Sequence, residues 1–283
     1  MRIEQTNALT LEQIKAIGEL EKAAFKKYSL ENHAFLSNEI NFDKRVPSFY
    51  MGYEGERLVA FLTFFIPSKQ EAEISAVTHP DFQRKGCFTA LFAAAQKTLH
   101  RINISRVLFV LEPRSKSGLA TLKTLVGSTF ERSEYRMSLS STDKLSSYEP
   151  LQFFEVDNSN KELFSEVLHQ VHTDMEDADN YALAVVNSNT RKGYIAYRET
   201  PVGVFNLNFE DGDAFLYGVG IAEKYRGNGL GKKLTGYAVT QGLKRAPRVV
   251  LDVNSDNPVA FHIYQQCGFQ IDFQVDYYSL NII

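Results

Sequence analysis

The sequence predicts an α/β protein in which one unit of helices and strands occurs twice. Its 283 residues exceed one average domain of roughly 100 to 200 residues, so two units of similar size are expected. The same landmark residues recur in the same order in both halves, and strand-like and helix-like segments follow a similar order in each half. Together these observations indicate a duplicated α/β unit.

Four pairs of landmarks define the repeat. Gly229 lies 143 residues after Gly86 (229 minus 86), and the other pairs keep almost the same separation. The pairs are 59–61 with 202–204, Gly86 with Gly229, Gly127 with Gly268, and 135–139 with 277–280. Polar residues between the halves read as a linker. We therefore predict domains over 1–140 and 150–283, with a linker over 141–149.

The expected elements follow one order in both halves, judged by β-branched and aromatic content for strands and by apolar spacing for helices. In the first half they are a helix over 11–27, strands over 48–53, 57–66 and 71–78, a helix over 87–100 and a strand over 106–111. In the second half they are a helix over 161–173, strands over 190–197, 201–209 and 213–221, a helix over 230–243 and a strand over 248–253. A further helix, a glycine and two strand-like segments close each unit.

Charge and hydropathy exclude several classes of function. A net charge of −3 and a pI of about 6.1 give no long-range attraction to nucleic acid or to anionic membranes. The longest apolar run, 58–66, is far shorter than the roughly 20 residues of a membrane-spanning helix. The N-terminus has no apolar segment typical of a secretory signal. We expect a cytoplasmic protein with no nucleic-acid or membrane partner.

The cysteine and histidine content points to neither a disulfide nor a metal site. Cys87 and Cys267 each lie beside a glycine in an apolar setting, which is typical of reduced packing residues. His169, His172 and Glu176 share the spacing of one helix face, but no fourth ligand accompanies them. We expect no metal.

The most informative stretch is 225–233, which reads YRGNGLGKK between a predicted strand and an amphipathic helix. Glycines let backbone amides approach a ligand, and a helix start offers free N–H groups and a positive dipole end, so a pyrophosphate fits here. The alternating glycines do not match G-x-G-x-x-G, and Arg226 replaces the first glycine of a P-loop. Both of those nucleotide motifs are therefore excluded.

The stretch matches Q/R-x-x-G-x-G/A and resembles motif A of the GNAT acetyltransferases. About 25 residues further on, Asn257, Ala260, Tyr264, Gly268 and Phe269 resemble the next motif of that family, N-x-x-A-x-x-x-Y-x-x-x-G-F. The resemblance covers 152–280 and, more loosely, the whole chain. It implies two tandem GNAT-like domains, each a mixed, mostly antiparallel sheet flanked by helices.

The resemblance also implies an acetyl-CoA site in the second half. The family's loop amides hold the pyrophosphate, which implies a cradle of Arg226, Gly227, Asn228, Gly229, Leu230 and Gly231. A backbone N–H at Val219, Gly220 or Ile221 would meet the thioester carbonyl, and Asn254 or Asn257 would contact the cofactor. Tyr264 would act as the general acid for the departing thiolate.

The general base is left open. Glu210, Asp211, Asp213 and Tyr217 lie on or just before the strand that faces the expected acceptor, but the first three also suit an ordinary polar turn. Many family members deprotonate the amine through water. No single base is therefore chosen.

The first half departs from the family pattern. Its loop, 82–88, reads FQRKGCF, so that Phe88 stands where the motif has glycine or alanine. Pro113 falls near the asparagine position, and Leu122 or Lys123 replaces the tyrosine. We expect this half to be structural or acceptor-binding, although its basic residues offer an alternative contact to CoA phosphates; these are Arg84, Lys85, Arg114 and Lys116.

The predicted function is transfer of acetyl from acetyl-CoA to the primary amine of a small molecule or peptide N-terminus, by direct attack, in a monomer or homodimer. Two alternatives stay open: a non-catalytic acyl-CoA sensor, and an acyltransferase with an aminoacyl or peptidyl acceptor. The acidic stretch 175–179 and the segment 206–213 are the expected acceptor region, with acidic residues favouring a cationic amine.

Overall fold

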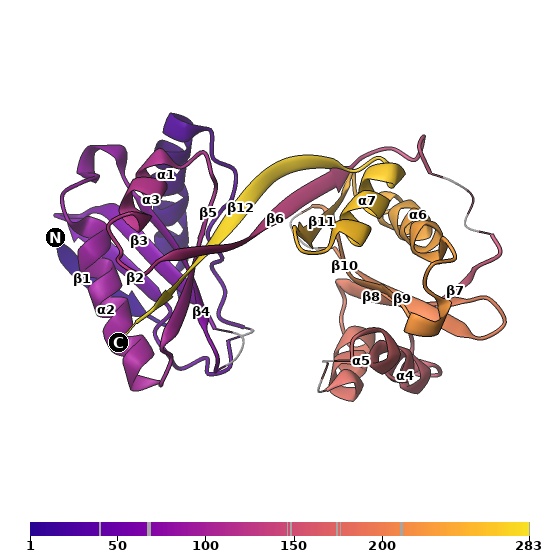
Figure 1. Ribbon diagram of the computed structural model, residues 1–283. Coiled ribbons are helices and arrows are strands. Elements are labelled where there is room, and N and C mark those ends of the chain that lie inside the picture. Colours follow the sequence, from indigo (N-terminus) through magenta and orange to yellow (C-terminus); the bar gives the residue numbers. More distant parts are fainter. Residues whose placement is uncertain are drawn as a thin grey trace. The chain divides into compact units, whose positions relative to one another are not determined.

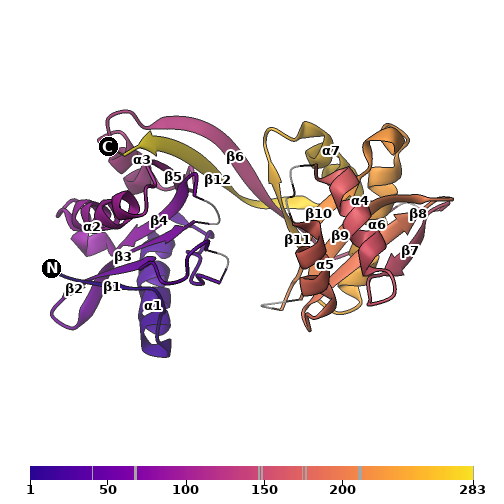
Figure 2. The same cartoon turned by 90° about the horizontal axis from the view of Figure 1, so that it is seen from below.

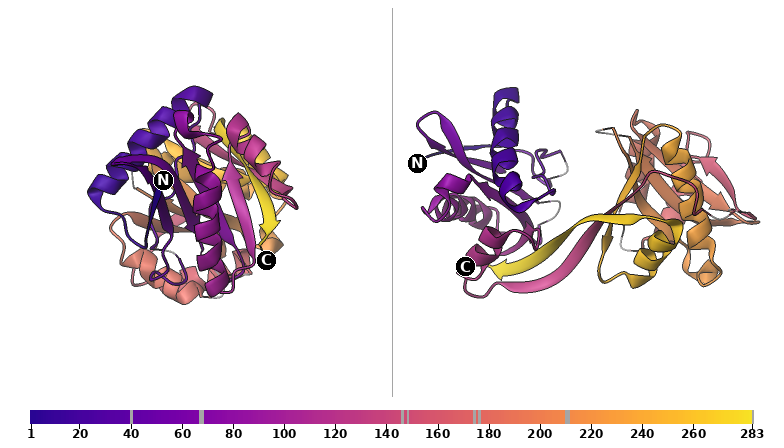
Figure 3. Two further views of the ribbon diagram at one scale, coloured as in Figure 1. Left: turned by 90° about the vertical axis from the view of Figure 1, so that its left-hand side faces the viewer. Right: turned by 90° about the horizontal axis from the view of Figure 1, so that it is seen from above.

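The computed structural model describes residues 1–39, 41–66, 69–145, 147, 149–173, 175, 177–209 and 212–282 (Figure 1). The chain forms two compact units. The first comprises Met1–Glu134 together with Phe273–Ile283, and the second comprises Tyr135–Asp272. Both chain termini thus belong to the first unit (Figure 3).

The first unit is one sheet with helices on both faces. Its elements are β1 (Arg2–Thr6), α1 (Leu11–Tyr28), β2 (Phe49–Glu54), β3 (Arg57–Phe65), β4 (Ala72–Thr78), η1 (Pro80–Phe82), α2 (Cys87–Arg101), β5 (Arg106–Leu111), α3 (Lys116–Leu122), most of β6 (Thr129–Leu139) and most of β12 (Gln270–Asn281). The strand order is β1-β2-β3-β4-β5-β12-β6. Neighbouring strands from β1 to β4 are antiparallel, β4 and β5 are parallel, and β12 is antiparallel to β5.

Alternation along β2 and β3 explains why this sheet is covered on both faces. Tyr50 and Leu62 face a core made with α2, whereas Met51 and Phe61 face a second core made with α1. Figure 2 shows α1 and α2 on opposite sides of these strands. Because both faces are buried, β3 reads as a continuous apolar run instead of an alternating one.

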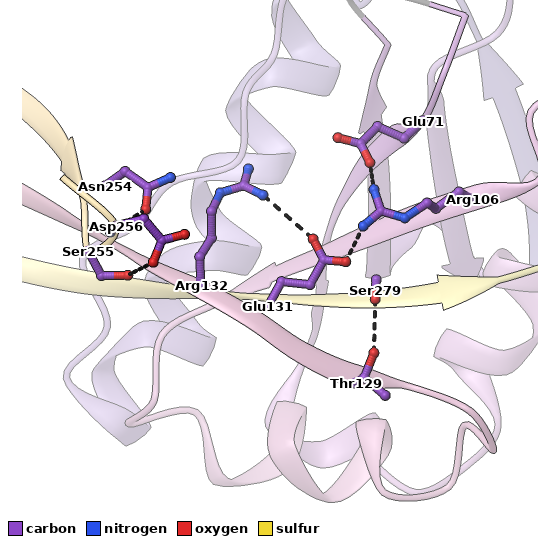
Figure 4. A network of polar contacts seen from close by, with 9 residues as sticks. All are labelled: Glu71, Arg106, Thr129, Glu131, Arg132, Asn254, Ser255, Asp256 and Ser279. Atoms are coloured by element: carbon purple, nitrogen blue, oxygen red, sulfur yellow. Dashed lines mark hydrogen bonds and ion pairs between the residues drawn. The ribbon is translucent and has the colours of Figure 1, made fainter.

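An ion-pair network closes the edge of the first unit (Figure 4). The guanidinium of Arg106 on β5 lies between the carboxylates of Glu71 and Glu131. Thr129 and Ser279 share a hydroxyl hydrogen bond of 3.0 Å between β6 and β12. The ion pairs thus join β5 to β6 and to the residue before β4, and the hydroxyl pair joins β6 to β12.

The second unit repeats this plan. Its elements are β7 (Gln152–Glu155), α4 (Lys161–Val171), α5 (Ala178–Val186), β8 (Arg191–Tyr197), β9 (Pro201–Asn208), β10 (Ala214–Ile221), η2 (Glu223–Tyr225), α6 (Leu230–Leu243), β11 (Val249–Asn254) and α7 (Pro258–Cys267), with the end of β6 and the start of β12. The strand order is β12-β6-β11-β10-β9-β8-β7. Helices α4 and α5 cover one face and α6 and α7 the other (Figure 1).

The boundaries of the two units differ from the predicted ranges 1–140 and 150–283. The reason is that β6 and β12, the last strand of each half, run from one unit into the other. In the first unit, β12 pairs with β5 from Asp276 to Asn281. In the second unit, β6 lies beside β11, and Arg136 binds Asp252 through two hydrogen bonds of 2.5 and 2.9 Å. The first unit therefore contains most of β12, which follows α7 of the second unit in sequence. The second unit contains the end of β6, which follows α3 of the first.

The predicted α/β fold with two similar units is confirmed, and most predicted elements agree with the structure to within a few residues. The prediction missed the edge strands β1 and β7 and the short helix α5. It also expected two strand-like segments at the end of each half, where the structure has one long strand, β6 or β12. Cys87 and Cys267 are buried free thiols, as predicted.

Among the described residues, no helix is long and apolar enough to cross a membrane. The same part of the chain holds no cluster of three or more histidine, cysteine or acidic side chains that suits a metal ion. Glu176, which the sequence placed near His169 and His172, lies outside the described residues.

Candidate active site

The second unit opens between two parallel strands. β10 and β11 pair only at Ala214 with Val249 and at Phe215 with Val250. Further along, the pairing of β10 with β9 is interrupted between Tyr217 and Gly220. Gly218 has a φ of +57°, which only glycine adopts without strain. β10 and β11 thus diverge, or splay apart, after Phe215. This divergence and the bulge leave the backbone of Val219, Gly220 and Ile221 without a partner strand on the β11 side.

The loop after β10 presents backbone instead of side chains. Gly227 and Gly229 have φ angles of +79° and +70°. A Cβ added at either position would meet no heavy atom within 4 Å. Gly229 is the N-cap of α6 and offers no side-chain cap, so the first amides of the helix keep free N–H groups. The helix dipole adds positive potential at this end.

Two side chains of the loop stabilise it from within. Arg226 donates through Nε to the carbonyl oxygen of Ile221 at 2.9 Å. Asn228 donates through Nδ2 to the carbonyls of Tyr225 and Arg226 at 3.2 and 3.1 Å. These bonds fix the turn while the loop surface stays exposed. The arrangement fits a pyrophosphate, the group that the sequence predicted here.

Leu230 and Gly231 serve packing as well as the loop. The side chain of Leu230 is only 4% exposed and belongs to the core under α6. A Cβ at Gly231 would lie 3.1 Å from Cδ1 of Ile263 on α7. The glycine therefore lets α6 and α7 approach closely, a role that the motif alone did not distinguish from ligand contact.

The two candidate asparagines cap backbone at the start of α7. Oδ1 of Asn254 accepts from the amide of Asp256 at 2.9 Å (Figure 4). Oδ1 of Asn257 accepts from the amide of Ala260 at 3.0 Å and so forms the N-cap of the helix. Both residues thus shape the turn beside the splayed strands, with Pro258 at the first helical position.

Tyr264 on α7 is buried, but its hydroxyl has no hydrogen bond within the described part of the chain. Its side chain is 8% exposed and its ring lies 5.8 Å from that of Phe269. Burial, with a smaller contribution from Cys267, raises the pKa of Tyr264 to about 12. A buried tyrosine usually finds a partner for its hydroxyl, so this one is available to a ligand.

The other side of the β10 bulge is covered by the end of α4. Gly220 has to be glycine because a Cβ there would overlap the side chain of Val171. The ring of His172, at the end of that helix, places Nε2 3.3 Å from the carbonyl oxygen of Gly218. In the sequence, His172 stands out only as a candidate metal ligand. No local pattern places it against the bulge, because that contact spans 46 residues.

The base candidates named from sequence have other partners or lie outside the described residues. Asp213 forms an ion pair with Arg248, with Nη2 and Oδ2 2.8 Å apart. Tyr217 hydrogen-bonds Tyr181, and burial and this contact raise the pKa of Tyr181. Glu210 and Asp211 fall on positions that the structure does not describe.

A buried carboxamide lies beside the bulge. Asn206 on β9 is 1% exposed, and neither Oδ1 nor Nδ2 has a hydrogen-bond partner among the described residues. Nδ2 would lie 2.8 Å from a Cβ at Gly218. A buried polar group without a partner costs about 1–3 kcal/mol of stability, so this residue calls for a functional explanation.

The first unit keeps the backbone of the same loop. Arg84 and Gly86 have φ angles of +62° and +78°, at the positions of Gly227 and Gly229. Gln83 donates to the carbonyl of Thr78 at 3.4 Å, as Arg226 does to Ile221, and it also contacts Tyr28 and Ser117. The loop conformation is therefore shared although its sequence differs.

Beyond the loop, the first unit is closed by its own side chains. The ring of Phe88 stacks on Phe92 at 5.6 Å and lies 6.3 Å from Phe109 on β5. At the end of β5, Glu112 accepts hydrogen bonds from the amides of Glu31 and Asn32 at 2.5 and 2.8 Å. β4 pairs with β3 without a bulge over its recorded register, Ala60–Phe65 against Glu73–Thr78. Within the described residues, β4 thus lacks the bulge of β10, and α3 has no tyrosine like Tyr264.

Comparison with known proteins agrees with this geometry. The model of the acetyltransferase (GNAT) family matches the chain twice, over residues 14–118 and 152–269. A stretch of 69 residues is 45% identical to a mycothiol acetyltransferase of Corynebacterium aurimucosum. That stretch makes up 22% of this chain and 21% of that protein, so the match spans about a fifth of the curated relative.

Solved structures share the complete fold at low identity. A GCN5-related N-acetyltransferase from Sphaerobacter thermophilus superposes with a TM-score of 0.78 at 14% identity, over 99% of this chain and 95% of that one. A tandem GNAT protein from the clavulanic acid biosynthesis pathway gives 0.68 at 14% identity, over 99% and 98%. An acetyltransferase from Colwellia psychrerythraea gives 0.68 at 14% identity, over 99% and 100%.

Proposed function

The chain belongs to the acetyltransferase (GNAT) family, and from this membership we propose that its second unit transfers acetyl from acetyl-CoA to a primary amine. The observation that carries the proposal is the open loop between Arg226 and Gly229 next to the splayed β10 and β11. In the first unit the loop is also open at Gly86, but beyond it the ring of Phe88 packs near Phe109 and Glu112 binds the segment after α1. One cofactor site per chain follows.

Acetyl-CoA fits the second unit at two places. The free amides at the start of α6 and the two open glycine positions suit its pyrophosphate. The backbone of 219–221, which has no partner strand on the β11 side, suits a carbonyl oxygen that gains negative charge. When bound, the cofactor would supply the thioester carbon that the amine attacks.

Two side chains of the second unit are the proposed proton donor and proton acceptor. Tyr264 keeps its proton at neutral pH because burial raises its pKa to about 12, and its hydroxyl is the proposed donor to the departing sulfur. His172 faces Gly218 through Nε2. If Nε2 donates to that carbonyl, Nδ1 keeps the lone pair that takes the proton of the amine. A His172→Gln variant with wild-type kcat would contradict this role.

The acceptor in this proposal is a small amine or a peptide N-terminus, and the first unit has a structural role. The helices α4 and α5, which cover the bulge, form the acceptor side. Transfer requires no covalent intermediate on the enzyme, because the described site contains no activated nucleophile: the pKa of the Cys267 thiol is raised to about 11 by burial.

The test is a matched pair of glycine variants assayed for CoA release with a panel of amines. Gly229→Leu places a side chain in the proposed cradle, and Gly86→Leu places one at the equivalent position of the first unit. Both glycines have positive φ and open space around them, so the backbone strain is similar. We expect only Gly229→Leu to abolish turnover. Equal loss in both variants, or binding of acetyl-CoA without turnover of any amine, would overturn the proposal, the latter in favour of a sensor.

A further inference from the structure

One face of β9 is covered by α4 and α5. Along this face, the apolar residues that pack against the helices are followed by two asparagines. Val204 packs against these helices. Asn206 and Asn208 follow at alternate positions, on the same face of the strand. Asn206 lacks any partner for Oδ1 or Nδ2, and Asn208 lacks one for Oδ1, within the described residues. Three neighbouring amide atoms without partners point to a group that the described chain itself does not supply.

The carboxamide of Asn206 lies beside the bulge. It is paired in register with Tyr217, the last residue before the bulge. Around a Cβ built at Gly218, the only described atoms within 4 Å are Nδ2 and Cγ of Asn206. His172 contacts the carbonyl of the same glycine. The amide therefore borders the region where the amine would be acetylated.

The hydrogen-bonding chemistry of the unpaired atoms defines the kind of ligand group that would satisfy them. A carboxamide offers N–H donors at Nδ2 and an acceptor at Oδ1, and it cannot neutralise a buried charge. A group with one N–H donor and one carbonyl acceptor satisfies both ends at once, and that group is another amide. Asn208 adds one more acceptor about 7 Å further along the strand, which matches the spacing of same-side groups in an extended peptide.

We infer that Asn206 determines acceptor specificity and that the acceptor carries an amide next to its primary amine, as in an amino-acid amide or a peptide N-terminus. This inference rests on the proposed function, since it concerns the acceptor side of the same site. Asn206 binds the acceptor and takes no part in proton transfer.

The test compares two acceptors whose amines have similar basicity, alaninamide and alanine methyl ester. The ester keeps the carbonyl but lacks the N–H donor. For the wild-type protein we expect kcat/KM to favour the amide at least tenfold, about the effect of one hydrogen bond in a buried site. In an Asn206→Leu variant, which keeps a similar volume, the preference should disappear while the ester is still acetylated.

The outcomes separate the inference from the proposed function. Wild-type protein that acetylates both acceptors equally would overturn the amide specificity and leave the acetyltransferase intact, with a buried water on Asn206. Protein that neither binds acetyl-CoA nor acetylates any amine would overturn both. If Asn206→Leu does not fold, the wild-type ratio of amide to ester still decides, and Asn206→Asp, which replaces the N–H donor with a second, charged acceptor oxygen, supplies the second variant.

Discussion

The two units share one loop backbone but differ in what lies beyond it. Positive φ angles occur at Arg84 and Gly86 in the first unit and at Gly227 and Gly229 in the second. In the first unit, an aromatic ring bridges α2 and β5 and a glutamate holds the segment after α1. In the second, Gly231 stands where the first unit has Phe88, although both helices begin at a glycine without a side-chain cap. We therefore propose that loop geometry alone does not make a cofactor site and that the space beyond the loop decides.

The largest effect is expected at the tyrosine that only the second unit has. Tyr264→Phe should lower kcat about 100-fold, the low end for losing a general acid, and leave acetyl-CoA affinity unchanged. Because the pKa of Tyr264 is about 12, the wild-type enzyme should lose no activity through this group between pH 7 and 10. A pH series of kcat for both proteins measures this. A wild-type decline below pH 10 that is missing in the variant would contradict the assignment.

The same pKa has a consequence for stability. Tyr264 is protonated in the folded protein up to a pKa of about 12, above the ordinary value of about 10 for an unfolded tyrosine. Its contribution is therefore fully present below pH 10 and is lost as the pH rises from 10 to 12. Chemical denaturation at pH 8 and 11 should show a smaller decrease for Tyr264→Phe than for wild type. An equal decrease in both proteins would contradict the burial effect.

A middle-sized effect concerns the ring that closes the first unit. Phe88→Ala should lower the free energy of unfolding by about 2 kcal/mol, since the ring is half-buried between Phe92 and Phe109. Acetyl-CoA affinity should not change. Urea denaturation and calorimetric binding check the two parts. A variant that gains a second binding site would show that Phe88 alone had closed the first unit.

The smallest effect is expected from the strained residue in the first loop. Arg84 adopts a φ of +62°, which costs a residue with a Cβ roughly 1 kcal/mol relative to glycine. Arg84→Gly should therefore raise the free energy of unfolding by about 0.5 kcal/mol or slightly more. Urea denaturation measures the change. Loss of acetyl-CoA binding in this variant would mean that Arg84 contacts the phosphates.

Sequence patterns predicted the structural features that depend only on residues close together in the chain. The strand-to-helix loops and the start of α6 at Leu230 follow from residues next to one another. The cap at Asn257 was not predicted, because the family motif had suggested a cofactor contact there. The exchange of β6 and β12 does not follow from such patterns, because alternation along a strand says nothing of which neighbour it pairs with. The contact of His172 with Gly218 and the unpaired Asn206 also depend on distant residues, so only the folded chain reveals them.

The central claim is that one chain has one cofactor site, in the second unit. Calorimetric titration of acetyl-CoA into the wild-type protein and into Gly229→Leu tests it most directly. The account predicts one site per chain in the wild type and none in the variant. Two sites, or a site that persists in Gly229→Leu, would contradict it.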